Sequence, residues 1–319
     1  MPVPVLSEAL AIETYNAVKK YMSLRGAANR LGIPESTLKE RYYNGLKRGL
    51  FEPIERLEWT YPTQVDVEVK RGSVLIGSDA HTWPGQKPFI YEVFLEVAAT
   101  LKPKVIILNG DMFDGTRISR FGHLRGQNAP KVSEELETSK AQVDRIPGTP
   151  KKIMTIGNHC TMRVDQYFAN AASEADDICP KAEDWFPDWR MCYAAMINGH
   201  VEVRHRFRSG IHARHNNTVN SGISMVTGHT HQLGVTPFDD RNGRRYGIEC
   251  GMLNDPMAPQ FEYTEGQPTR WCAGFAVLTF DEEGRLLPPE LCEMTNGRAW
   301  FRGASWGVGK PKIYGGMFV

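Results

Sequence analysis

The sequence lacks the features that define several large classes of protein. No apolar stretch approaches the ~18 residues of a membrane-spanning helix, and the first residues show neither the basic start nor the apolar core of a secretory signal. We therefore expect a cytoplasmic protein without a membrane partner. The six cysteines are scattered and form no C-x-x-C pair, which favours reduced thiols over a disulfide framework or a zinc knuckle.

Over the chain as a whole, neither sign of charge is in large excess. The 38 Lys and Arg residues nearly balance the 37 Asp and Glu residues, so the net charge is +1 and a strongly basic protein is excluded. The balance is not uniform, because residues 1–50 hold eight Lys or Arg against four Glu. The basic character is therefore confined to the first fifty residues, and the remainder is slightly acidic.

What is present is typical of a folded globular chain. Hydrophobic residues make up 41% and charged residues 24% of the 319 residues. We expect four segments: a small helical domain at 1–50, a linker and edge strand at 51–72, a large domain at 73–295 and a glycine-rich tail at 296–319.

The first fifty residues show a pattern of short helices about a glycine turn. Apolar residues recur at helical spacing over 9–21, Ser23 can cap a second helix over 24–31 that stops at Gly32, and a third helix begins near Ser36. The segment SLRGAANRLGIPESTLKERYYNG resembles a helix-turn-helix of the homeodomain-like or Psq type. The resemblance implies that the helix from Ser36 to Leu46 lies in the major groove of DNA.

Basic residues on and after this third helix are the candidate DNA contacts. The four that suit phosphate groups are Lys39, Arg41, Lys47 and Arg48. An oligomerisation element or a protein-docking module is the alternative interpretation, because helix-turn-helix geometry recurs in proteins that bind no DNA. The sequence does not define the oligomeric state.

From residue 73 onward, short apolar runs recur, and each ends in side chains of the kinds that bind metals. The runs are VLIGSDAH, VIILNGDMFD, IMTIGNHC, VEVRH and SMVTGHTH. Such runs predict buried strands, and helical patterns over 89–101 and 132–145 lie between the first three. The alternation predicts an α/β fold in which ligands gather where the strands end.

In chain order these runs supply D-x-H, G-D-x-x-D, G-N-H, a histidine that ends a strand, and G-H-x-H. They are Asp79-Ala80-His81, Gly110-Asp111-Met112-Phe113-Asp114, Gly157-Asn158-His159-Cys160, His205 and Gly228-His229-Thr230-His231. The ordered set resembles the calcineurin-like metallophosphoesterases from about residue 73 to residue 232. The resemblance implies a β-sandwich flanked by helices, an αββα architecture, and a hydrolase that uses two divalent metal ions.

The resemblance also implies a role for each motif residue. Asp111 would bridge the two metals, with Asp79, His81 and His231 on one metal and Asn158, His205 and His229 on the other. A hydroxide that bridges the metals would attack phosphorus, and His159 would stabilise the transferring phosphate or protonate the leaving oxygen. Asp114 would orient a ligand by a hydrogen bond. Nitrogen and oxygen ligands without thiolate admit Mn²⁺, Fe, Zn²⁺ or Ni²⁺, and Mn²⁺ is the working choice.

Two positions carry an alternative or a departure. His212 is the alternative to His205, but His205 closes an alternating run and lies far enough before His229 to leave room for a helix over 213–220. Cys160 stands where the family usually has Asp or Glu. We expect this thiol to lie beside the metal ligands and to alter how His159 is held.

Three functional hypotheses follow, and the first is preferred because both modules indicate the same polymer, DNA. The leading hypothesis is a metal-dependent phosphoesterase that acts on DNA, as a nuclease or phosphodiesterase brought there by its helix-turn-helix. The second is a phosphatase or phosphodiesterase of small phosphoesters or nucleotides, whose N-terminal module serves oligomerisation or docking. The third is a DNA-binding regulator without activity, and the intact set of ligand types argues against it.

Overall fold

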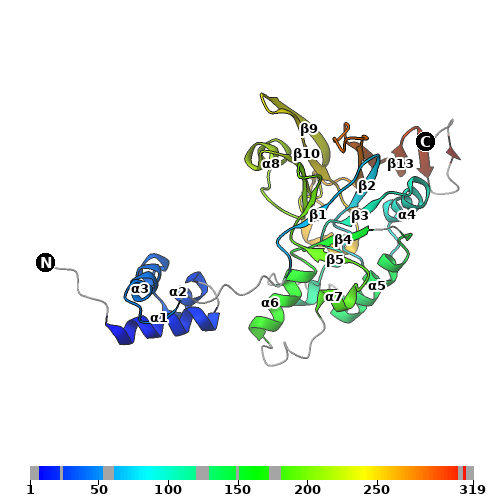
Figure 1. The fold of residues 1–319 in the computed structure, drawn as a ribbon. Coiled ribbons are helices and arrows are strands. Elements are labelled where there is room, and N and C mark those ends of the chain that lie inside the picture. Colours follow the sequence, from blue (N-terminus) through cyan, green and yellow to red (C-terminus); the bar gives the residue numbers. More distant parts are fainter. Residues whose placement is uncertain are drawn as a thin grey trace. The chain divides into compact units, whose positions relative to one another are not determined.

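The computed structural model describes residues 7–21, 24–52, 61–119, 129–148, 151–171, 181–307 and 312–313. Contacts divide the chain into two compact units, Met1–Thr60 and Tyr61–Val319. Helices α1, α2 and α3 belong to the first unit, and the described strands all belong to the second (Figure 1).

The first unit consists of three short helices. They are α1 (Glu8–Tyr21), α2 (Leu24–Leu31) and α3 (Glu35–Lys47). Gly32 follows α2 with a φ of 66°, a left-handed conformation that glycine adopts without steric cost, and the Ile33 N–H donates to the Ala28 carbonyl at 3.1 Å. The expected helix-turn-helix is therefore confirmed.

A small apolar core fixes α3 against its neighbours. Ala28 of α2 and Leu38 of α3 are almost completely buried in it. The Phe51 ring closes the core by packing on Tyr15, with ring centroids 4.6 Å apart. Gly45 makes room for that ring, because a Cβ at this position would stand 2.5 Å from it. One side of α3 is therefore buried, and the other faces away from the core.

The second unit contains two β-sheets. The six-stranded sheet has the order β1 (Val65–Val67), β6 (Ala195–Ile197), β7 (Val201–Arg204), β8 (Ser224–Thr227), β10 (Gly243–Cys250) and β9 (Leu233–Asp240). The nine-stranded sheet has the order β15 (Lys312–Ile313), β14 (Ala304–Gly307), β13 (Arg298–Phe301), β12 (Glu290–Thr295), β11 (Gly274–Phe280), β2 (Gly72–Gly77), β3 (Val105–Leu108), β4 (Lys151–Thr155) and β5 (Arg190–Cys192). Strands β2 to β5 pair in parallel, and β11 runs antiparallel to β2.

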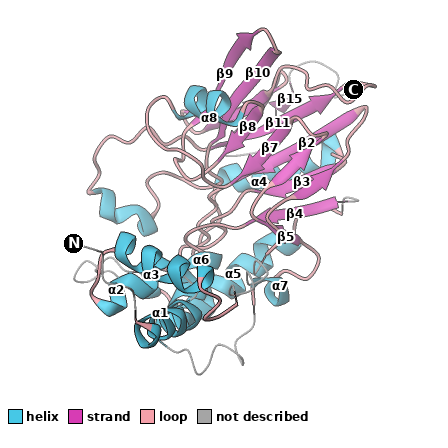
Figure 2. Ribbon diagram, turned by 60° about the vertical axis from the view of Figure 1, so that its left-hand side comes forward, coloured by secondary structure: helices cyan, strands magenta, loops and turns pink. Residues whose placement is uncertain are grey.

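Helices lie outside both sheets. They are α4 (Phe89–Leu101), α5 (Val132–Asp144), α6 (Thr161–Ala171), α7 (Ala182–Trp185) and α8 (Ala213–Ser221), together with the 3-10 helices η1 (Thr116–Ile118) and η3 (Pro259–Thr264). In Figure 2, α4, α5, α6 and α7 lie by the nine-stranded sheet, and α8 lies by β8, β9 and β10, which it contacts.

Alternate residues of the strands supply two separate cores, as the period of two along a strand requires. Val74 and Ile76 of β2 pack with Val203 of the other sheet, which forms the core between the sheets. Leu75 packs with Phe94 of α4, which forms the core between the nine-stranded sheet and its helices. The predicted α/β fold, a helix-flanked β-sandwich with a small helical unit before it, is confirmed.

The segment expected as a glycine-rich tail contributes β13 and β14, which extend the nine-stranded sheet through β12. Trp306 is 7% exposed, and its indole N–H donates to a Glu96 carboxylate oxygen. Residues 308–311 and 314–319 lie outside the described part. The predicted boundaries at 50, 72 and 295 stay predictions.

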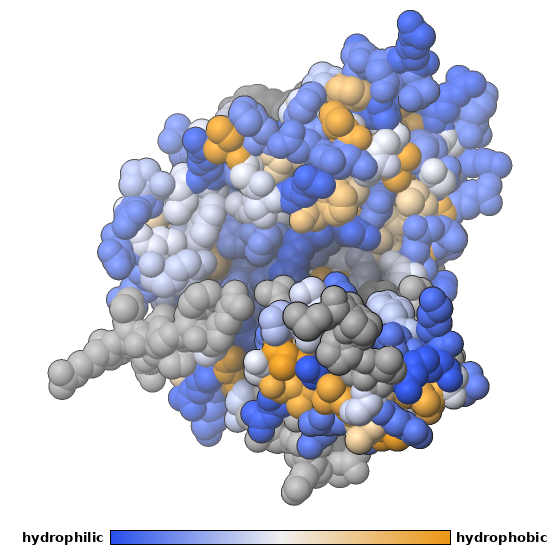
Figure 3. All heavy atoms as spheres, turned by 90° about the vertical axis from the view of Figure 1, so that its left-hand side faces the viewer, coloured by the Kyte–Doolittle hydropathy of each residue, from blue (hydrophilic) through white to orange (hydrophobic). Residues whose placement is uncertain are grey.

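The surface is mostly polar where it can be seen. On the face drawn in Figure 3, hydrophilic side chains predominate and hydrophobic ones form small patches. Of the helices in the described ranges, none combines the length and the hydropathy needed to cross a bilayer.

Candidate metal centre and recognition helix

The candidate ligands follow the ends of five strands. Asp79 and His81 follow β2, Asp111 follows β3, Asn158 follows β4, His205 follows β7, and His229 and His231 follow β8. Strands β2, β3 and β4 are parallel, and so are β7 and β8, so the carboxyl ends meet at one edge within each sheet. The fold thus gathers residues that are up to half the chain apart.

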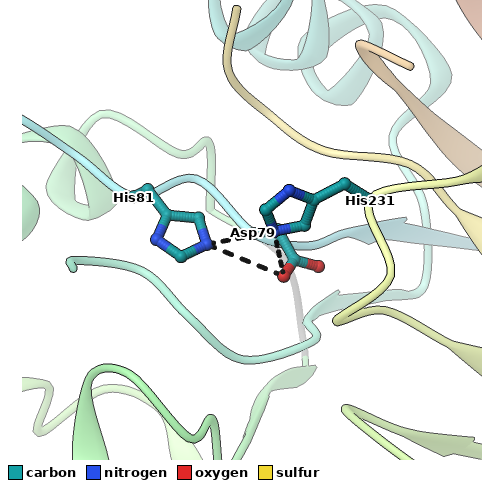
Figure 4. A group of neighbouring side chains, drawn as sticks. All are labelled: Asp79, His81 and His231. Carbon is teal, nitrogen blue, oxygen red and sulfur yellow. Dashed lines mark hydrogen bonds and ion pairs between the residues drawn. The ribbon is translucent and has the colours of Figure 1, made fainter. Parts of the chain in front are cut away.

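The first group consists of Asp79, His81 and His231, all buried (Figure 4). Asp79 Oδ1 lies 3.2 Å from His231 Nε2 and 3.8 Å from His81 Nε2, and the two Nε2 atoms are 3.3 Å apart. The other carboxylate oxygen, Oδ2, accepts the His229 backbone N–H at 2.9 Å. Two imidazole nitrogens and one carboxylate oxygen therefore converge on one point.

The second group consists of Asp111, His205 and His229, and each offers one ligand atom within 4.8 Å of the others. His205 Nε2 lies 3.0 Å from Asp111 Oδ2 and 3.1 Å from Asn158 Oδ1. Its Nδ1 is 2.7 Å from the Asn109 carbonyl, which sets the ring so that Nε2 faces the carboxylate. The other oxygen of Asp111 accepts the His159 backbone N–H at 2.8 Å.

Asp114 connects the first group to His159. Its Oδ1 lies 3.0 Å from His81 Nδ1 and 2.8 Å from His159 Nδ1, so one carboxylate orients both rings. Thr116 Oγ1 donates to its other oxygen. Because His159 uses Nδ1 for this contact, its Nε2 stays available for another partner, and its side chain is 22% exposed.

Five of the seven candidate ligands share an unusual backbone conformation. Asp79, His81, Asp111, His229 and His231 have φ between 40° and 68°, in the left-handed region that side chains with a Cβ rarely adopt. Such strain persists only where the surrounding structure enforces it, and it gathers at functional sites. Of the eleven described non-glycine residues with a positive φ, five are thus candidate ligands.

The glycines of the motifs are explained by close approach of the backbone to the ligands. A Cβ at Gly157 would collide with the backbone nitrogen and Oδ1 of Asp111. One at Gly228 would stand 2.7 Å from Asp79 Oδ2, and one at Gly110 would stand 2.5 Å from His205 Nδ1. Any larger residue would displace a ligand at each of the three positions.

The charges of the centre are mutually dependent. Burial opposes ionisation of Asp79, but the charges of His205 and His231 hold its pKa well below the usual range. Burial lowers the pKa of His81, yet the hydrogen bond to Asp114 and the nearby Asp79 carboxylate outweigh it and raise that pKa to about 10. The pKa of His229 falls to about 4, because it is buried beside the charged His205. The site therefore holds buried carboxylates that stay anionic and attract positive charge.

This donor set fits divalent cations. Carboxylate, imidazole and amide groups are ligands of Mn²⁺, Fe, Zn²⁺ and Ni²⁺, and each group places its atoms around a common point. Asp79 Oδ1 is also buried without a hydrogen-bond partner among the described residues, as expected of an oxygen that serves a cation.

Sequence analysis missed the buried polar residues that support the ligand loops. Glu135 of α5 is fully buried and accepts the backbone N–H groups of Gly115 at 2.6 Å and Thr116 at 3.3 Å, just after Asp114. It stands in the run SEELE, where nothing in the sequence separates a buried acid from its exposed neighbours.

A second support lies under the G-H-T-H loop. Glu249 of β10 is 1% exposed, accepts the Thr230 hydroxyl and lies 3.3 Å from Arg214 Nη1. On the other side of the centre, Asn254 and Gln260 donate side-chain N–H groups to the carbonyl of His81 at 3.2 Å and 2.8 Å. These partners come from segments that the motifs do not include.

The remaining sequence-based candidates lie outside the ligand groups. His212 is exposed at the N-cap of α8, so the structure brings His205 and not His212 to Asp111. Cys160 is 3% exposed and packs with Phe113 and Val164, and burial raises the pKa of its thiol. Its thiol thus lies in an apolar cluster, and the influence expected on His159 stays a prediction.

The candidate DNA contacts lie on or directly after α3. Lys39 is half-exposed and pairs with Glu35 at 2.7 Å, whereas Lys47 is exposed at the end of the helix. Tyr43, 57% exposed, lies between them on the same helix face, where helical spacing places residues four apart. Arg41 is partly exposed, and Arg48 is exposed at the C-cap.

Comparison with known families finds a match in each unit. Residues 72–220 match the family model of the calcineurin-like phosphoesterases, and residues 9–48 match the helix-turn-helix, Psq domain. Both resemblances found in the sequence are therefore confirmed.

Individual relatives cover only part of the chain or are distant from it. The Gene 54 protein of Mycobacterium phage L5 is 29% identical over 136 residues, which are 41% of this chain and 50% of that protein. The Gene 54 protein of Mycobacterium phage D29 is 33% identical over 91 residues, 27% of this chain and 34% of that protein. The chain thus matches half or less of the length of these curated relatives.

Solved structures with some likeness include Vps29 complexed with Zn²⁺ from Entamoeba histolytica, at 13% identity and a TM-score of 0.36, over 73% of this chain and 96% of that chain. Yfce, a phosphoesterase from E. coli, matches at 12% identity and a TM-score of 0.31, over 68% of this chain and 97% of that chain.

Proposed function

We propose that the chain is a phosphoesterase with two divalent metal ions, Mn²⁺ as the working choice, that hydrolyses phosphodiester bonds of DNA. The observation that carries the proposal is the convergence of two largely buried ligand groups from five strand ends, in which five of the seven ligands have left-handed backbone conformations. Asp79, His81 and His231 would hold one metal, and Asn158, His205 and His229 the other. Asp111 would be shared between them.

The bound cations would supply Lewis-acid activation of water and neutralise charge on the phosphoryl group. The chain's own residues supply orientation. Asp114 fixes the ring of His81 and that of His159, and Asn109 fixes the ring of His205. The available Nε2 of His159 would meet the phosphate, where it stabilises negative charge or passes a proton to the leaving oxygen.

The first unit supports DNA as the polymer. Its helix α3 presents Lys39, Tyr43 and Lys47 on a face that its own core leaves open. Cations at such positions neutralise backbone phosphates and recruit DNA without regard to sequence. The helix-turn-helix would then raise the local concentration of phosphodiester bonds near the second unit.

The test measures Mn²⁺-dependent hydrolysis of bis-p-nitrophenyl phosphate and of labelled single- and double-stranded DNA by the full chain. We expect His159→Ala to lower kcat on both substrates by about 10²- to 10⁴-fold, the usual worth of a positioned acid or base. We expect His205→Ala to abolish both reactions. His212→Ala is the matched control, because this histidine lies outside the ligand groups and should leave both rates unchanged.

The double variant Lys39→Ala, Lys47→Ala separates the polymer from small substrates. It should weaken the reaction on DNA and leave bis-p-nitrophenyl phosphate unaffected. If the full chain cleaves only small esters and the double variant changes nothing, the DNA assignment is wrong. The alternative of a small-molecule phosphoesterase with a docking module would then replace it.

A further inference from the structure

An aromatic cluster stands directly beside the first ligand group. It consists of Phe261 and Tyr263 from η3 and of Trp271 from the segment before β11. The Trp271 ring centroid lies 4.4 Å from that of His231, and the Phe261 centroid lies 5.3 Å from that of His81. The five motifs contain none of these three rings, and the ligand roles proposed above do not use them.

Hydrogen bonds tie the segments that carry these rings to the ligand loops. Gln260, next to Phe261, donates from Nε2 to the His81 carbonyl at 2.8 Å. The backbone N–H of Cys272, next to Trp271, donates to the His231 carbonyl at 2.8 Å. The rings are therefore held in a fixed position relative to the metal ligands, as a binding surface requires.

The three rings differ in how far they are exposed to solvent. Phe261 is 2% exposed and packs with Met252, Ala258 and the partly buried Trp271. Tyr263 is 54% exposed, although its centroid lies 6.3 Å from that of Trp271. Core packing explains the first two rings and does not explain Tyr263, which rests on them with much of its surface open.

The charges around the centre act on the hydroxyl group of Tyr263. Desolvation, followed by the negative charge of Asp114, raises the pKa of Tyr263 to about 12, and Arg163 acts in the opposite direction. Arg163 donates to the Asp114 carbonyl, and Asp114 orients His159. By geometry, Tyr263 adjoins the first ligand group through Phe261 and Trp271, whose ring centroids lie 6.5 Å and 6.3 Å from its own.

The opposite end of the centre is basic instead of aromatic. Arg206 is exposed next to His205, and its charge contributes, after burial and His205, to the lowered pKa of His229. Its Nη2 lies 3.5 Å from Met162 Sδ, on the helix that follows His159. An aromatic surface at one end and a cation at the other are the elements that bind single-stranded nucleic acid.

We propose that Tyr263, supported by Trp271 and Phe261, is the platform on which the nucleobase next to the scissile phosphate stacks. The substrate class is then a nucleotide phosphodiester with an unpaired base, because a base inside a duplex has no free face to offer. The inference rests on the proposed function, since it assigns the substrate of the same centre. Stacking of the base would also make the centre prefer nucleotide phosphodiesters to simple alkyl phosphoesters, which have no base.

The experiment compares two esters that share a leaving group. One is thymidine 5′-(p-nitrophenyl phosphate), and the other is methyl p-nitrophenyl phosphate, which has no base. Both are hydrolysed by the full chain with Mn²⁺, and kcat/KM is measured for the wild type, Tyr263→Ala and Tyr263→Phe. Trp300→Ala is the matched control, because Trp300 is an aromatic residue of similar exposure, 48%, on β13.

We expect Tyr263→Ala to lower kcat/KM for the thymidine ester by roughly 5- to 150-fold, the usual worth of one base-aromatic stack. The methyl ester should change by less than about twofold. Tyr263→Phe should keep most of the activity on both esters, and Trp300→Ala should change neither.

An equal loss on both esters would show that Tyr263 supports the site as a whole, and no loss on either would show that it is not used. Both results would overturn the inference. A wild-type chain that hydrolyses neither ester would contradict the proposed function itself, and the inference with it.

Discussion

The two units of this chain place their candidate functional residues in opposite ways. In the first unit, the four candidate DNA contacts lie on or directly after α3, and all four are at least partly exposed to solvent. In the second unit, seven candidate ligands come from five strand ends, and five of the seven are buried. Each basic residue of the first set should therefore contribute separately to binding, whereas the ligands of the second set should act together.

Substitution of the shared ligand should have the largest effect. Asp111→Ala removes the carboxylate that would serve both metals, so we expect activity on every phosphoester to fall by about 10³-fold or more. Binding of DNA by the first unit, measured by fluorescence anisotropy, should be unchanged. A variant that keeps more than a tenth of wild-type kcat/KM would show that Asp111 is not a ligand.

A glycine that touches a ligand should be the next most sensitive position. In Gly157→Ala the new Cβ collides with Asp111, so we expect loss of metal and a fall in activity of about 10²-fold. Gly148→Ala is the matched control, because nothing lies within 4 Å of a Cβ there. Equal activity of the two variants would contradict the close approach on which the metal centre depends.

The exposed helix should show smaller and selective effects. Lys47→Ala removes one phosphate contact, so we expect DNA affinity to fall by up to about tenfold and the slope of log affinity against log salt to decrease by about one. Hydrolysis of bis-p-nitrophenyl phosphate should not change. Lys19→Ala, at the exposed end of α1, is the control. An equal effect of both lysines would remove α3 as the recognition helix.

The smallest expected effect concerns Glu135, which should make the free energy of unfolding depend on pH. Burial raises the pKa of Glu135 to about 7 from its usual 4.5, so the folded chain holds this proton more tightly than the unfolded chain. The tighter binding of this proton contributes about 3 kcal/mol to the free energy of unfolding. The contribution is complete below pH 4.5 and is lost as the pH rises to 7.

Thermal unfolding of the metal-free chain at several pH values measures this contribution. Relative to Glu135→Gln, the wild type should lose stability between pH 4.5 and 7 and change little above it. If the difference between the two proteins does not vary with pH, Glu135 does not titrate in this range.

The same comparison explains how much of the molecule could be predicted from the sequence. The helix-turn-helix and the strand-terminal ligands could be predicted, because each motif is local and its apolar run or glycine turn lies within a few residues. His205 could be preferred over His212 because it closes a strand.

The parts that could not be predicted depend on contacts between distant segments. Glu135 looks like any surface acid of a helix until the structure shows that it accepts backbone N–H groups after Asp114. Tyr263 lies far along the chain from His159, and only the fold brings its segment to the first ligand group. Cys160 follows a motif histidine, yet its side chain packs into an apolar cluster, since neighbouring residues point in different directions.

The most direct test of the central claim is the structure of the full chain crystallised with Mn²⁺, with the metal located by its anomalous scattering. The account predicts two peaks, one among Asp79, His81 and His231 and one among Asn158, His205 and His229, with Asp111 between them. A single peak, or manganese bound only outside these two groups, would contradict a two-metal phosphoesterase centre.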